Sequence, residues 1–186
     1  ATNIHLLKAG IELQLSDITY GSPGVIRPTV ISGRTVLRPY INDTDPTYPG
    51  TKTYKPISFA AFAQDRVEWK DVMVRGGVRL EYFDANTTVP SNLQNPADTI
   101  AGAPRSVLKK TKKKIVVAPR LGVSYPVIAN GSVYFSYGHF YQMPAINKFF
   151  SNSNYKVLAT LAGGNENYDP YGNPDLKPEF TTQYEF

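Results

Sequence analysis

The feature that most limits what this chain can fold into is a repeated order of segments. A strand with alternating apolar side chains is followed by a tight turn, a second such strand and then a long polar loop. Residues 57–83 contain one strand pair, which turns at Lys70-Asp71, and residues 115–140 contain another, whose short turn ends in Asn130-Gly131. The loops between the pairs are rich in Pro, Gly, Asn and Lys. This order predicts antiparallel hairpins separated by long connections.

Six segments show the alternation expected of strands, in which successive side chains point to opposite faces. They are residues 4–15, 57–69, 72–83, 115–125, 132–140 and 179–186. A short strand within residues 25–37 could lie inside the first long connection. Pro119 has no N–H for a strand ladder, so it predicts a bulge or break in the fourth segment.

Alternation alone fits two kinds of all-β fold. A soluble sandwich with one wetted face alternates, and so does a membrane-spanning barrel. The two tight turns fall between the second and third strands and between the fourth and fifth, so all three long loops leave the same end. Short turns at one end and long loops at the other are typical of outer-membrane barrels, the smallest of which have about 8 strands. We therefore expect an antiparallel transmembrane β-barrel wall, about six strands of a larger barrel, with short periplasmic turns and long extracellular loops.

Composition argues against several function classes. The chain has no Cys, which excludes disulfides, zinc-thiolate sites and thiol catalysis. Its two His lie in different predicted strands, its carboxylates are dispersed, and no nucleophile elbow is present. We expect no enzyme, no metal site and no cofactor. Much of the formal charge of +5 lies in the lysine run at residues 109–114, which we interpret as a solvated loop in preference to a lipid-headgroup or nucleic-acid contact.

Several segments, in order, resemble the barrel domain of TonB-dependent outer-membrane receptors. Three match closely, and a fourth region looks like the preceding hairpin of that family. They are residues 118–127 (APRLGVSYPV), 133–144 (VYFSYGHFYQMP) and 172–179 (GNPDLKPE), with the hairpin at 59–68 (FAAFAQDRVE) and 74–84 (VRGGVRLEYFD). The similarity extends from about residue 55 to the end.

This resemblance implies a barrel of about 22 strands, closed by a plug domain and placed in the bacterial outer membrane. It implies uptake of a scarce nutrient, such as a siderophore, cobalamin, glycan or peptide, with energy supplied through the TonB complex. The implied partners are outer-membrane lipid, the rest of the barrel, the plug, the TonB complex and a small-molecule ligand, with no nucleic acid. No plug is recognisable, so residues 1–186 are expected to be a partial barrel domain.

Two other function classes stay open beside the receptor. One is a structural or adhesive β-protein that assembles through exposed strand edges. The other is a soluble carbohydrate-binding β-module. The terminal Tyr184-Glu185-Phe186 superficially resembles the assembly signal of complete outer-membrane proteins, although we favour truncation of a longer chain.

Three sets of residues are candidates for functional or structural roles. The last long loop offers aromatic rings and amides suited to sugars, aromatic chelates or peptides, or alternatively to packing the loop against its neighbours. These are Tyr141, Gln142, Asn147, Phe149, Phe150 and Tyr155. Lumen-facing candidates, which could guide an anionic ligand or pair with each other and with a plug, are Arg75, Arg79, Glu81 and Arg120. A turn motif that returns the chain to the wall is Asn173, Pro174, Asp175, Leu176, Lys177 and Pro178.

Overall fold

The structure is a computed structural model that describes residues 4–21, 25–40, 51–96, 98, 100–128, 131–151, 153, 155 and 171–186. Its described part is almost entirely β. The elements are β1 (Ile4–Leu15), β2 (Ile18–Gly21), β3 (Val25–Ile31), β4 (Arg34–Tyr40), β5 (Thr51–Tyr54), β6 (Ile57–Trp69), β7 (Val72–Asp84), β8 (Thr88–Pro90), β9 (Leu108–Lys110), β10 (Lys114–Ile128), β11 (Gly131–Gln142), α1 (Ile146–Phe150) and β12 (Glu179–Glu185).

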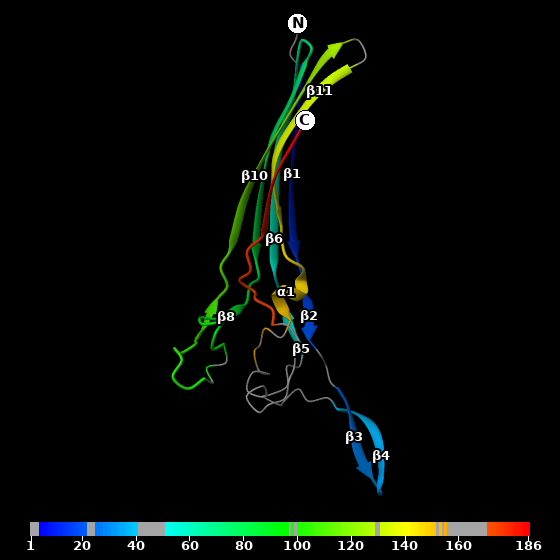
Figure 1. The fold of residues 1–186 in the computed structure, drawn as a ribbon, viewed down its shortest axis with the longest axis vertical. Helices are drawn as coiled ribbons and strands as arrows, with labels where there is room; N and C mark the ends of the chain where they lie inside the picture. The colour runs from blue at the N-terminus through cyan, green and yellow to red at the C-terminus, as the bar shows by residue number, and fades with distance from the viewer. Residues whose placement is uncertain are drawn as a thin grey trace.

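The long strands form one six-stranded antiparallel sheet in the order β1-β6-β7-β10-β11-β12. These are the six strands that the alternation predicts, and the all-β antiparallel class is confirmed. Figure 1 shows the sheet as a long, curved ribbon of strands, with the β6–β7 and β10–β11 turns at one end and the smaller elements at the other. Lys70 makes the β6–β7 turn in a left-handed conformation, with φ of 53°. The predicted grouping of long loops at one end is therefore present.

The first long connection contains more structure than the sequence indicated. The expected short strand at residues 25–37 is in fact a hairpin of β3 and β4, which pairs from Val25↔Tyr40 to Ile31↔Arg34. Ser32 and Gly33 turn the chain with φ of 51° and 76°. A Gly in the left-handed conformation removes the steric cost of that turn. The chain therefore reverses there and forms two paired strands instead of one.

Of the bulge or break expected at Pro119, the bulge is wrong, while the ladder to β11 does break beside it. The β7–β10 register runs without a shift through Pro119↔Val78, and the β10–β11 ladder begins only at Arg120. Pro119 therefore has no partner on β11, and its missing N–H removes no hydrogen bond from that ladder. The irregularity of this strand lies between Pro126 and Ile128. The predicted turn residue Asn130 is outside the described residues.

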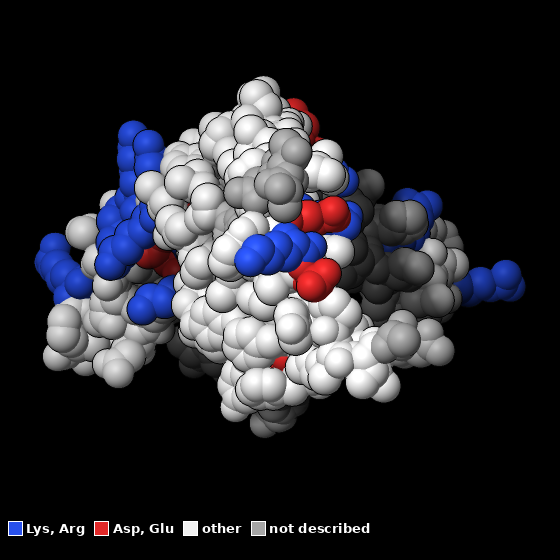
Figure 2. All heavy atoms as spheres, turned by 90° about the horizontal axis from the view of Figure 1, so that it is seen from above, with Lys and Arg blue, Asp and Glu red and all other residues white. Residues whose placement is uncertain are grey.

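The sheet is a single layer whose small core lies at the loop end. Tyr54, Phe83, Ala85, Phe149 and Phe150 form the buried cluster, called here the loop-end core. Along the sheet itself large apolar side chains are exposed, as at Ile11 with 83% and Ile115 with 64%. Viewed along the long axis from the tight-turn end, most of the surface is uncharged (Figure 2). Among the described residues, no helix is long and apolar enough to cross a membrane.

Candidate functional site

The strand register separates the side chains of the sheet into two chemically different faces. On β7, Arg75, Arg79 and Glu81 share one face, and Arg120 of β10 joins them because it pairs with Gly77. All four predicted lumen candidates thus lie on one side, called here the polar face. The opposite, apolar face carries Ile57, Phe59, Ala61, Ala63, Val67, Val72, Val74, Val78, Leu80, Ile115, Val117, Leu121 and Val123.

A charged residue interrupts the middle of the apolar face. Asp65 of β6 lies between Ala63 and Val67 on that face. Its Oδ2 is 2.7 Å from His5 Nδ1 on the neighbouring strand β1. The pairing gives one carboxylate oxygen of Asp65 a hydrogen-bond partner on a mostly apolar face.

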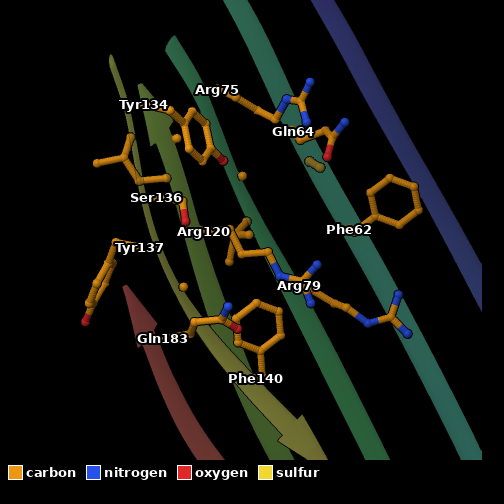
Figure 3. A pocket seen from close by; sticks show the side chains of 16 residues that line it. Phe62, Gln64, Arg75, Arg79, Arg120, Tyr134, Ser136, Tyr137, Phe140 and Gln183 are labelled. Atoms are coloured by element: carbon orange, nitrogen blue, oxygen red, sulfur yellow. The ribbon is translucent and has the colours of Figure 1, made fainter. Parts of the chain in front are cut away.

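A groove of about 440 Å³ lies in the middle of the polar face (Figure 3). Strands β6, β7, β10, β11 and β12 all contribute to it. Its lining includes Phe62, Gln64, Arg75, Gly77, Arg79, Arg120, Gly122, Tyr134, Ser136, Gly138, Phe140 and Gln183. The size is within the usual range of small-molecule sites, and three guanidinium groups make the lining cationic.

The charges around the groove are only partly paired. Arg79 Nε donates to Glu81 Oε1 at 2.6 Å, and Arg66 pairs with Glu68 just beyond the groove. Arg120 lies over the Phe140 ring, 4.6 Å from its centroid. Within the described part of the chain, neither Arg75 nor Arg120 forms an ion pair. The groove therefore holds two cationic groups that no described carboxylate neutralises.

The loop candidates have different environments from those expected. Tyr141 and Gln142 are the last residues of β11, not of a loop, and Asn147 is exposed on α1. Phe149 and Phe150 are 0% and 1% exposed. They pack in the loop-end core, where the Phe150 ring stacks on Tyr54 at 4.2 Å and the Phe149 ring lies 5.1 Å from Phe83. The positions of both rings fit the alternative raised from the sequence, in which they pack the loop against its neighbours.

Tyr155 is also inside this loop assembly and not at its surface. Its hydroxyl donates to the carbonyl of Gly172 at 3.0 Å, and 6% of the residue is exposed. Burial, with a smaller contribution from Tyr54, raises the pKa of the Tyr155 phenol to about 12. The expected exposure of Phe149, Phe150 and Tyr155 to a ligand is therefore corrected, because the rings fill the space beneath the loop.

The turn motif at residues 173–178 is bound to the start of β10. Asn173 Oδ1 accepts from the backbone N–H of Asp175 at 2.9 Å, and Asp175 Oδ1 accepts from the backbone N–H of Lys112 at 2.6 Å. Leu176 packs against the loop-end core. Pro174 is buried, while Lys177 is exposed and Pro178 leads into β12. These contacts connect the last long loop to the preceding one.

Lys114 is the residue that the sequence analysis missed. We interpreted it as the end of a solvated lysine run, yet it is 8% exposed and begins β10. Its Nζ donates to the carbonyls of Lys112 and Pro174, each at 3.1 Å, and lies 3.6 Å from Asp175 Oδ1. Lys109, Lys110, Lys112 and Lys113 are exposed. The sequence does carry one sign of this environment. Lys114 falls on the same face of the strand as Val116 and Ala118, because residues two apart in a strand point to the same side.

A curved antiparallel sheet with one polar face, one apolar face and all its long loops at one end is the wall of a membrane barrel. The family model described as "TonB dependent receptor-like, beta-barrel" matches residues 7–186. The chain therefore belongs to this family, whose members are receptors and transporters. No curated protein and no solved structure matches the chain.

Proposed function

We propose that residues 1–186 are part of the barrel domain of a receptor that takes up a scarce nutrient across the bacterial outer membrane. The nutrient class is the one that the family resemblance implies: a siderophore, cobalamin, glycan or peptide. Uptake would use energy from the TonB complex through a plug domain. The observation that carries the proposal is the separation of an apolar face from an arginine-bearing polar face on β6, β7 and β10.

The energetics of the two faces support this arrangement. Exposing a large aliphatic side chain to water forgoes about 1.5–3 kcal/mol relative to burial, and the apolar face exposes many, such as Ile11, Leu13 and Val117. Lipid would remove that cost. Arg75 and Arg120 need the opposite environment, since a charged side chain at the lipid face of a barrel costs about 2–4 kcal/mol near the bilayer midplane. A wall between lipid and an aqueous lumen satisfies both faces.

The alternative functions fit less well. A soluble carbohydrate-binding module would leave the apolar face in water without a covering layer. An adhesive protein that assembles through strand edges would use the outer edges of β1 and β12, but such assembly would not cover the apolar face either. Insertion into outer-membrane lipid, with the remaining barrel strands at both edges, covers the face and pairs the edges together.

The direct test uses the complete receptor expressed in a Gram-negative host. We expect it in the outer-membrane fraction, soluble only in detergent, and we expect nutrient uptake that stops when TonB is deleted. Recovery of the folded receptor in the soluble fraction would contradict the membrane assignment. Uptake that is the same with and without TonB would contradict the transport mechanism while leaving the membrane wall intact.

A further inference from the structure

The floor of the polar-face groove is built from Arg and Gly in alternating cross-strand positions. Arg120 of β10 pairs with Gly77 on β7 and with Gly138 on β11. On the next row of this face, Gly122 of β10 lies between Arg75 on β7 and Ser136 on β11. Neighbouring side chains lie over these glycines, since a Cβ at Gly77, Gly122 or Gly138 would come within 2.8 Å of Gln64, 3.3 Å of the Tyr134 hydroxyl or 3.0 Å of Phe140. The groove lies among these side chains and is bordered by long cationic ones.

The same register brings three guanidinium groups to that depression. Arg75 and Arg79 lie two residues on either side of Gly77, so both are diagonal neighbours of Arg120. Diagonal neighbours on one face of a sheet are roughly 7–8 Å apart, which is within reach of long side chains. Figure 3 shows the three side chains along the groove, with Arg79 and Arg120 extending in the same direction.

Only one of these three charges is neutralised by the described residues. Arg79 has Glu81 as its partner, whereas Arg75 and Arg120 form no ion pair there. Both side chains are also exposed to solvent. Guanidinium groups bind carboxylate and phosphate oxygens through paired N–H donors, which makes an oxyanion their preferred partner.

The remaining lining adds contacts suited to the body of a small molecule. Phe62, Tyr134 and Phe140 place aromatic rings around the depression, and Gln64, Ser136 and Gln183 add polar groups. The rest of the groove can therefore contact a small organic solute as well as its charged group.

We propose that this groove binds the oxyanion of a small carboxylate- or phosphate-bearing solute. Arg75 and Arg120 provide the main contacts, and Arg79 assists. The proposal rests on the proposed function, because it assigns an anionic class to the nutrient that passes along the wall.

The test measures binding to the complete receptor in detergent by calorimetry at low ionic strength. Citrate represents carboxylates, pyrophosphate represents phosphates, and glucose is the neutral comparison. We expect at least one of the two anions, and not glucose, to bind. The anion that binds identifies the oxyanion source. Arg120→Gln and Arg75→Gln should each weaken its binding about tenfold to hundredfold, since each removes a charged pair of donors.

Two further variants separate a built site from general attraction by positive charge. Gly122→Val keeps every charge but fills the floor. A Cβ there would meet the Tyr134 hydroxyl at 3.3 Å and its ring at 3.7 Å, with the Phe135 carbonyl oxygen at an ordinary 3.9 Å. Tyr134 should therefore be pushed further into the groove while the strand still folds, and binding should fall. Arg34→Gln removes the same charge from an exposed position on β4 and should leave binding unchanged. Circular dichroism and heat-modifiable migration on gels confirm that each variant is folded.

Three outcomes would overturn the proposal. One is the absence of anion binding to the folded wild type, as expected if a carboxylate from another part of the receptor occupies the groove. Another is an equal loss in Arg34→Gln and Arg120→Gln, and the third is unchanged affinity in Gly122→Val. Each of these leaves membrane location and TonB-dependent uptake as separately measured properties, so the proposed function can hold while this inference fails.

Discussion

Lys114 joins two loops that are distant in sequence. Its ammonium is nearly covered, donates to two carbonyl groups and approaches Asp175, while the rings of Phe83 and Phe149 lie 5.9 and 6.0 Å away. A long cation suits this position because it can donate to both carbonyl groups at once. Removing it leaves the buried carbonyl of Pro174 without this donor, which costs more than the net value of the bond.

We therefore expect Lys114→Met to lower the free energy of unfolding of the loop region by about 2–4 kcal/mol. Methionine keeps most of the side-chain volume but has no donor. Limited proteolysis of the complete receptor should then cut residues 84–114 faster, and the melting temperature should fall. Lys113→Met, at the exposed neighbouring position, is the control. Equal sensitivity of the two variants would contradict a buried role for Lys114.

The raised pKa of Tyr155 predicts that the stability of the same region depends on pH. Its pKa in the folded protein, about 12, is above the ordinary value of 10.0. The folded state therefore holds the phenol proton more tightly than the unfolded state does. The resulting stability is fully present below pH 10 and is lost as the pH rises from about 10 to about 12. Proteolysis of residues 141–177 should accelerate over that range.

The matched variant for this prediction is Tyr155→Phe, which keeps the ring and removes the hydroxyl. At pH 8 it should cost about 1 kcal/mol for the bond to Gly172. Between pH 10 and 12 it should lose less stability than the wild type, although Tyr54, whose pKa is also raised by burial, contributes to both. Identical pH profiles for the two proteins would show that Tyr155 does not titrate with unfolding.

Two adjacent glycines on β7, Gly76 and Gly77, have different amounts of space around them. A Cβ at Gly77 would lie 2.8 Å from Gln64 Cβ and 3.1 Å from the Ala63 carbonyl oxygen, whereas a Cβ at Gly76 meets nothing within 4 Å. The first pair of contacts involves the neighbouring strand itself, which cannot move away as a flexible side chain could. The β6–β7 pair is therefore closely packed at Gly77 and open at Gly76.

Gly77→Val should accordingly destabilise the wall by about 1–3 kcal/mol, through displacement of β6. Gly76→Val should be neutral, since valine suits a strand and points to open space on the apolar face. Heat-modifiable migration of the complete receptor after outer-membrane extraction measures this difference. A similar melting temperature for Gly77→Val and Gly76→Val would contradict the close approach.

The long strands could be predicted from sequence because each carries its own signal. Alternation along β7 places Arg75, Arg79 and Glu81 together without knowledge of any other strand. Alternation does not set the register, so the pairing of Arg120 with Gly77, which creates the groove floor, was not visible. The loop-end core was missed for a related reason, since Tyr54 and Phe150 meet only through the tertiary fold and neither lies in a periodic segment.

At the scale of the whole molecule, the two faces of the sheet and its loop end have different physical roles. The apolar face supplies hydrophobic surface, and among the described residues no second layer covers it. The polar face holds the cationic groove, and the loop-end core joins loop residues to the end of β7 around Phe83. Under the proposed function, lipid takes the place of a second layer on the apolar side.

Two neighbouring valines on β10 test this division directly. Val117 shares the apolar face with Ile115 and is 49% exposed, while Val116 points to the polar face with Arg120. Val117→Arg should impair outer-membrane assembly, because an arginine on the lipid side costs about 2–4 kcal/mol near the midplane. Val116→Arg makes the same change on the aqueous side and should assemble normally. If the variants had equal yields in the outer-membrane fraction, or if Val116→Arg were the worse, the orientation of the wall would be refuted.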